Sequence, residues 1–260
     1  MSPDAYFVPL DANRYRPTAH TGGGWTTTEQ HFSPIGGLLT HAIDRFVAAR
    51  GTDGLITSRI IFDILGTIAI EPFDVTVEVV RAGRTIELVE ANAIARGRPV
   101  VRARAWRLAG ADTRAIAGGQ PEPLPPPGGL EVKPLSAVWP GGYIASLEQR
   151  PIVASPGRAT VWLRTPVALV QGEEASGLAR FVMLLDTANG IASRESPDKW
   201  FYPNVDLTLH LYRQPRGDWV GLDTTVIFGA AGVGLTESVV HDIDGPVGRV
   251  EQILTIRPAA

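Results

Sequence analysis

The chain shows two patterns of apolar and polar positions. Apolar residues at 35, 39, 42, 43, 46 and 47 fall on one face of a helix predicted over 36–47. Residues 177–191 repeat this spacing, with Ser176 placed to cap the first turn. After each helix, apolar and polar residues alternate with period two, which predicts half-buried strands. The expected strands are 57–66, 73–82, 84–97 and 98–109 in the first half, 203–213, 218–228, 232–243 and 246–257 in the second, and shorter ones at 5–9, 143–150 and 159–165.

A segment rich in proline and glycine divides the chain. Residues 118–134 contain too many prolines to join a helix or a sheet, which predicts an extended linker. A shift of 147 residues then aligns Glu90 with Glu237 and Pro99 with Pro246 within matching strand–turn–strand units. The expected domains are an N-terminal repeat at 1–117, a linker at 118–137 and a C-terminal repeat at 138–260.

Composition narrows the class of protein. The 28 glycines and 21 prolines indicate many turns and short strands. A net charge of −3 gives no basic surface for nucleic acid or an acidic membrane. The absence of cysteine excludes disulfides, thiolate nucleophiles and thiolate metal sites, and the five histidines lack metal-ligand spacing. We therefore expect neither metal nor cofactor. With no secretory signal and no apolar run of about 18 residues, a soluble cytoplasmic protein is expected.

The order of elements predicts how the halves pack. One helix followed by a four-stranded antiparallel meander cannot bury both itself and a whole sheet face. Curling the sheet around the helix covers part of this surface, and pairing two such units side by side covers the rest. The sequence thus predicts an α+β fold, a double hotdog, in which two tandem repeats each wrap an antiparallel sheet around a long helix.

Several short stretches resemble the acyl-CoA thioesterase II family, in its double-hotdog branch. In the first half these include Gly24-Trp25, His31 and the Gly36-Gly37-Leu38-Leu39 run that opens the helix. The resemblance continues through the second half, at Asp186-x-x-Asn189-Gly190, Asn204-Val205-Asp206-Leu207-Thr208-Leu209-His210 and Gly248-Arg249-x-x-Gln252. It covers most of the chain outside the linker and implies hydrolysis of a fatty or related acyl-CoA.

The resemblance also implies a set of site residues. In this family a water molecule attacks the thioester carbonyl, positioned by an Asp, a Ser or Thr, and a Gln. The matching positions here are Asp206 and Gln252. The hydroxyl slot falls near Ile227, and the nearest hydroxyl of the same strand parity is Thr225. Backbone N–H groups at Gly36 and Gly37, at the expected helix start, are placed to stabilise the oxyanion.

The residues themselves support these roles unevenly. Gln252 shares strand parity with Val250 and Leu254, so its amide needs a hydrogen-bonding partner in an apolar setting. Asp206 alternates with leucines, a pattern that also fits a solvated strand face. Thr225 fits an ordinary strand position equally well. Asp186 is an alternative substrate-facing carboxylate, since it lies within a family-like stretch of the second helix.

The sequence leaves two other functions open. The Leu at position 38, where the family has Gln, and the displaced hydroxyl fit a non-catalytic acyl-CoA-binding protein. An Asp206–His210 pair on one strand face fits an enoyl-CoA hydratase. In each case the partner is an acyl-CoA, whose acyl chain is expected in an apolar tunnel beside the helices. A homo-oligomer is also expected.

Overall fold

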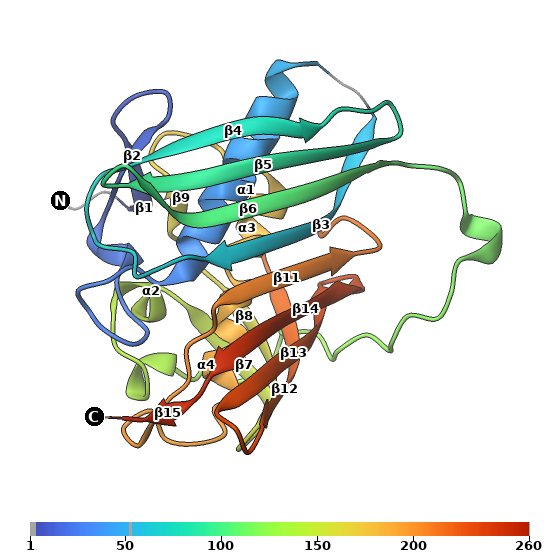
Figure 1. Ribbon diagram of the computed structural model, residues 1–260. Coiled ribbons are helices and arrows are strands. Elements are labelled where there is room, and N and C mark those ends of the chain that lie inside the picture. Colours follow the sequence, from blue (N-terminus) through green and yellow to red (C-terminus); the bar gives the residue numbers. More distant parts are fainter. Residues whose placement is uncertain (1–3, 52–53, 260) are drawn as a thin grey trace.

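The computed structural model describes residues 4–51 and 54–259, and its main feature is one large sheet. Thirteen strands of the described residues form this sheet, in the order β7-β8-β12-β13-β14-β11-β3-β6-β5-β4-β2-β1-β9 (Figure 1). The elements of the first half are β1 (Ala5–Pro9), β2 (Arg14–Pro17), η1 (Ala19–Thr21), α1 (Phe32–Ala49), β3 (Leu55–Ile64), β4 (Phe73–Arg81), β5 (Ile86–Ala95) and β6 (Arg98–Ala109). Between the halves lie η2 (Arg114–Ile116) and η3 (Leu135–Ala137).

The second half repeats this order of helix and meander. Its elements are α2 (Gly142–Ala145), β7 (Glu148–Ser155), β8 (Arg158–Arg164), β9 (Ala168–Val170), α3 (Gly177–Val182), η4 (Leu185–Thr187), α4 (Ala188–Ile191), β10 (Trp200–Phe201), β11 (Asp206–Leu211), β12 (Val220–Phe228), β13 (Val233–Asp242), β14 (Gly245–Thr255) and β15 (Arg257–Pro258). The expected strands of both meanders are therefore confirmed, with shifts of a few residues at their ends.

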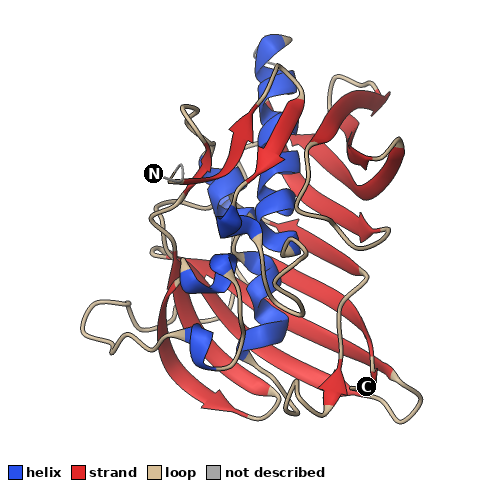
Figure 2. Cartoon of the chain, turned by 90° about the vertical axis from the view of Figure 1, so that its left-hand side faces the viewer, coloured by secondary structure: helices blue, strands red, loops and turns tan. Residues whose placement is uncertain are grey.

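The two halves join through one antiparallel strand pair. β3 of the first half lies against β11 of the second, with Phe62 opposite Leu207 and Ile60 opposite Leu209. The helices cover one face of the combined sheet, as Figure 2 shows. This is the α+β double-hotdog arrangement that the sequence predicts. The division into domains at 1–117, 118–137 and 138–260 stays a prediction.

The two central helices differ in regularity. α1 is continuous over 18 residues and buries Ile35, Leu38 and Ile43 almost completely. The second helix is broken, because the predicted 177–191 segment forms α3, the 3₁₀ turn η4 and the short α4 in succession. The predicted N-cap is confirmed, since Ser176 Oγ accepts a hydrogen bond from Ala179 N at 3.0 Å. The break turns η4 toward the end of α1.

The linker follows the surface of the second half. The chain leaves β6, passes through η2 and then enters the linker, which returns to the sheet as an extended strap (Figure 1). Trp162 Nε1 donates to Pro125 O at 2.7 Å, and Arg150 donates to Pro127 O at 2.9 Å. The proline-rich segment is thus extended and tied to β7 and β8. Among the described residues, no helix is both long and apolar enough to cross a membrane.

Candidate active site

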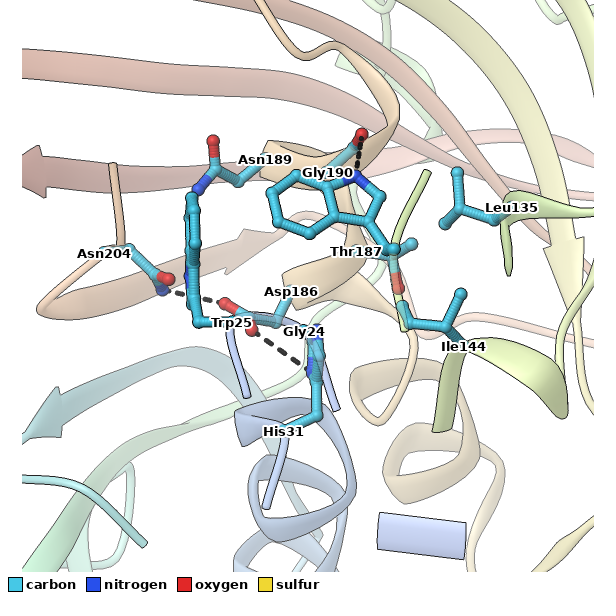
Figure 3. A pocket seen from close by; sticks show the side chains of 11 residues that line it. Gly24, Trp25, His31, Leu135, Ile144, Asp186, Thr187, Asn189, Gly190 and Asn204 are labelled. Carbon is cyan, nitrogen blue, oxygen red and sulfur yellow. Dashed lines mark hydrogen bonds and ion pairs between the residues drawn. The ribbon is translucent and has the colours of Figure 1, made fainter. Parts of the chain in front are cut away.

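A buried carboxylate, Asp186, lies at the centre of the site. The residue is 7% exposed, and its Oδ1 accepts hydrogen bonds from Asn204 Nδ2 at 2.7 Å and Gln252 Nε2 at 2.6 Å. Its Oδ2 lies 3.5 Å from His31 Nδ1. Figure 3 shows the Asp186 carboxylate between Asn204 and His31. Three side chains from separate parts of the sequence therefore meet at one carboxyl group.

Both halves of the fold contribute to this cluster. Asp186 stands in η4, the turn that breaks the second helix, and Asn204 lies just before β11. Gln252 is a buried residue of β14, whose side chain shares the inner sheet face with Val250. His31 comes from the first half, where it is the N-cap of α1. The site exists only because the two repeats pack together.

His31 is held in its neutral form. Its Nδ1 accepts a hydrogen bond from Ser33 N at 3.1 Å, which assigns the ring proton to Nε2. The ring lies against Tyr143, with ring centroids 4.3 Å apart. Burial lowers the pKa of His31 to about 3. Asp186 therefore faces an uncharged imidazole, which gives its ionised form no ion-pair stabilisation.

The environment of Asp186 shifts its titration toward neutral pH. Burial raises the pKa of Asp186 to about 7, and the hydrogen bonds from Asn204 and Gln252 oppose this rise. A buried carboxyl group that titrates near pH 7 is suited to accept and return a proton. Among the described residues no amide donates to Oδ2, so this oxygen is the one available to a reactant.

Two spaces meet at the carboxylate. A cleft of about 560 Å³ is lined by Asp186, Asn204 and His31, together with Phe32 and Val205. A small cavity of about 40 Å³ is also lined by Asp186, Asn204 and His31. Asp186 is therefore open to a bound molecule although its side chain is buried.

Comparison with protein families decides what kind of protein this is. A model of the acyl-CoA thioesterase N-terminal domain matches residues 21–108, and one of the C-terminal domain matches residues 119–256. This chain belongs to the acyl-CoA thioesterase family. It is a thioester hydrolase, and its substrate is an acyl-CoA. A comparison with curated proteins finds no match.

Solved structures show the same fold over nearly the whole thioesterase. An acyl-CoA thioesterase II from Mycobacterium marinum has a TM-score of 0.67 and 16% identity, covering 99% of this chain and 96% of that one. A hot dog fold protein from Alicyclobacillus acidocaldarius has a TM-score of 0.74 and 14% identity, with 99% and 98% covered. A tesB protein from Mycobacterium avium subs paratuberculosis has a TM-score of 0.66 and 15% identity, with 97% and 96% covered.

Two residues expected in the active site of the thioesterase lie elsewhere. Asp206 is on the outer face of β11, where its Oδ1 accepts from Ile253 N at 2.7 Å. Thr225 is on the outer face of β12, where its hydroxyl accepts from Arg158 at 3.3 Å. Gln252 has the hydrogen-bonding partner that its strand parity requires, and that partner is the Asp186 carboxylate. Neither Asp206 nor Thr225 joins Gln252, because strand alternation places them on the opposite face of the sheet.

The outer face also holds the pair expected for a hydratase. His210 is exposed and, like Asp206, points away from the inner face of β11. The Asp206–His210 pair therefore does not face the cleft at Asp186. The hydratase interpretation is not favoured, and neither is a non-catalytic binder.

The paired glycines have a different role from the expected one. α1 begins at Phe32, so Gly36 and Gly37 lie in its second turn and their N–H groups belong to the helical ladder. A Cβ at Gly37 would come within 2.5 Å of Met183 Cβ and 3.1 Å of Ala179 O. The glycines let α1 and α3 approach closely. This corrects their assignment to an oxyanion site.

The sequence did contain signals for the residues that do meet. Asp186 is a carboxylate within the apolar run Phe181–Ala188, and Asn204 lies in a family-like stretch. His31 precedes the helix at a position typical of an N-cap. The sequence pattern alone does not show that these three residues lie together, because their contact depends on the packing of the two halves and on the break in the second helix.

Proposed function

We propose that Asp186 is the general base that activates water for attack on the thioester carbon. The observation that supports this proposal is the arrangement of its two oxygens. Oδ1 accepts two amide hydrogen bonds, from Asn204 and Gln252, which fix the plane of the carboxylate. Oδ2 accepts no amide hydrogen bond among the described residues, and Asp186 lines the cleft, so a water molecule bound in the cleft can donate to Oδ2. Asn204 is thus the second polar side chain of the site beside Gln252, a role for which the family resemblance implied the hydroxyl of Thr225.

The reaction balances with Asp186 alone as the proton carrier. Oδ2 takes a proton from water while the water oxygen bonds to the carbonyl carbon. The tetrahedral intermediate then expels the sulfur of coenzyme A, and Asp186 returns the proton to that sulfur. The products are a carboxylic acid and a free thiol. A carboxyl group with a pKa of about 7 suits both steps at neutral pH.

The N-terminus of α1 supports the negative charge that develops on the carbonyl oxygen. Phe32 begins this helix and lines the same cleft as Asp186. As the first residue of the helix, it has no carbonyl one turn earlier within α1 to accept its N–H. The helix dipole adds partial positive charge at this end. We place oxyanion stabilisation here in place of Gly36 and Gly37.

Paired substitutions at two aspartates test the site. Asp186→Asn preserves the shape and both amide hydrogen bonds but removes the base, so thiol release from acyl-CoA is expected to fall by about 10²–10⁴-fold. Asp206→Asn makes the same chemical change on the outer face and is expected to stay within about twofold of the unmodified enzyme. Turnover is followed with a thiol reagent. Full activity in Asp186→Asn, or an equal loss in Asp206→Asn, contradicts the assignment.

We further propose that the enzyme is cytoplasmic and forms a homo-oligomer. A chain without cysteine needs no oxidising compartment for disulfide formation, which supports the first point. Exposed apolar residues on the outer sheet face support the second. Ile227 is 52% exposed and Ile253 is 40% exposed, and both lie beside Leu235 in the strand register.

A further inference from the structure

The small cavity beside Asp186 combines polar walls with apolar ones and shares Trp25 with the open cleft. Its apolar walls are the side chains of Trp25, Trp139, Leu135 and Ile144. Trp139, Leu135 and Ile144 are each less than a tenth exposed. The cleft also mixes polar and apolar residues, with Glu29 and Arg257 among the polar ones. The two spaces beside the carboxylate therefore differ mainly in size, about 40 Å³ against about 560 Å³.

Resting on the proposed function, we infer that this cavity holds the acyl group and limits it to about two or three carbons. Coenzyme A is large and carries charged phosphates, so only the open cleft of about 560 Å³ can take its pantetheine arm. The thioester carbon must lie near Asp186 Oδ2, where the cleft and the cavity meet. The acyl group then points into the cavity. The substrate class is acetyl-CoA or propionyl-CoA.

The volume of the cavity sets the limit on chain length. An apolar cavity of about 150 Å³ in another protein accommodates a benzene ring of six carbons. The cavity beside Asp186 measures about 40 Å³, roughly a quarter of that value, which corresponds to about two carbons. The sequence predicts an apolar tunnel beside the helices without setting its length, and the inferred cavity would limit that length.

The wall at the far end is fixed in place. Trp139 Nε1 donates to Gly190 O at 3.0 Å, which holds the indole against the second half. A Cβ at residue 190 would lie 3.3 Å from Trp139 Nε1, so the glycine permits this close contact. Trp25 packs edge-on against Trp139, with ring centroids 4.8 Å apart. Because Leu135 lies in the segment 118–137, the predicted linker also forms part of this wall.

Chain-length profiles test the inference. Thiol release is measured with acetyl-, propionyl-, hexanoyl- and dodecanoyl-CoA, and kcat/KM for the two shortest is expected to exceed that for dodecanoyl-CoA at least 100-fold. Trp139→Ala is expected to raise the hexanoyl-to-acetyl ratio at least tenfold, since each methylene group in an apolar pocket changes discrimination about 10–200-fold. Leu135→Ala is a smaller truncation of the same wall and is expected to change the ratio in the same direction. Trp200→Ala, a partly exposed residue outside the cavity lining, is the control and keeps the original profile.

The outcomes separate this inference from the proposed function. A preference of the unmodified enzyme for dodecanoyl-CoA overturns the short-chain assignment and leaves Asp186 as the base. An unchanged profile in active Trp139→Ala and Leu135→Ala variants overturns it too. Absence of thiol release with every acyl-CoA overturns the proposed function, and the inference with it.

Discussion

At the scale of single residues, the two oxygens of Asp186 have separate tasks. Oδ1 receives both amide hydrogen bonds, and Oδ2 stays available beside a neutral His31. Hydrogen bonds alone lower a carboxyl pKa, whereas burial without a cation raises it. Here burial is the larger effect, so Asp186 titrates near pH 7. Replacing His31 by a protonated partner would remove this property.

The raised pKa predicts how activity depends on pH. Since the base must be ionised, kcat/KM is expected to fall about tenfold for each pH unit below about 7 and to level off above it. The pH–rate profile for acyl-CoA hydrolysis measures this directly. A profile that stays flat down to pH 5 contradicts the role of Asp186 as the titrating base.

Stability gives an independent check on the same shift. Because the pKa in the folded state lies above the ordinary value of 3.8, the neutral carboxyl contributes stability that is fully present below pH 4 and is lost as pH rises through about 7. Asp186→Asn avoids this loss. Its free energy of unfolding is expected to exceed that of the unmodified enzyme by up to ~4 kcal/mol at pH 9, with the gap closing toward pH 4.

Residue patterns predicted one member of the cluster well. Gln252 stood out because an amide at an apolar strand position needs a partner, and the structure supplies Asp186 Oδ1. The family resemblance pointed to Asp206 as the partner of Gln252, because Asp206 lies in a family-like strand stretch. Alternation places it on the outer face, and no local pattern shows that a helical carboxylate reaches Gln252 from the other side.

At the scale of elements, the contact between α1 and α3 positions the site. α1 carries the His31 N-cap to the cleft, and α3 leads directly into η4 and Asp186. The apolar stripe predicted α1, although the helix begins at Phe32, before the expected start at Gly36. The second stripe continued through Leu185 to Ala188 and predicted an unbroken helix, but the chain makes a 3₁₀ turn there. The turn brings Asp186 to its two amide donors, a tertiary contact that periodicity does not encode.

A methyl group at the helix contact tests how tightly these elements are packed. Gly37→Ala is expected to destabilise the protein by about 1–3 kcal/mol, since its Cβ would meet Met183 Cβ and the Ala179 carbonyl. The gain of about 1 kcal/mol in helix propensity does not offset this clash. The free energy of unfolding is measured by denaturant titration.

Gly36→Ala provides the matched control in the same helix turn. Its Cβ would lie 3.2 Å from the ring of Phe32, a side chain that can shift, and 3.7 Å from Val182. The expected change is within about 1 kcal/mol of zero because helix propensity and the tight contact oppose each other. Equal effects of the two substitutions would contradict the role assigned to Gly37.

At the scale of the whole molecule, the two halves are related but not equivalent. The 147-residue shift aligns Gln252 with Ala105 and Asn204 with Thr57. The first half therefore has neither of the two amide side chains that bind Asp186. Asp44 of α1 also lies near a helix N-cap, because it accepts a hydrogen bond at 2.5 Å from Oγ of Ser176, the N-cap of α3. The sequence predicted this duplication of the fold, but only the packed structure shows that the amide anchors occur on one side.

At this scale, the outer face of the sheet also predicts how the protein assembles. Ile227, Leu235 and Ile253 lie opposite one another on β12, β13 and β14 and form an apolar row. If this row packs against a second copy, the mass in solution is a multiple of 27.9 kDa. A double substitution, Ile227→Lys with Ile253→Lys, is expected to shift the mass to 27.9 kDa because burying two ammonium groups costs several kcal/mol. Light scattering on the eluted peak measures this. Ile116→Lys, at a residue of η2 that is 85% exposed, should leave assembly unchanged. An unmodified enzyme of 27.9 kDa at micromolar concentration rules the interface out.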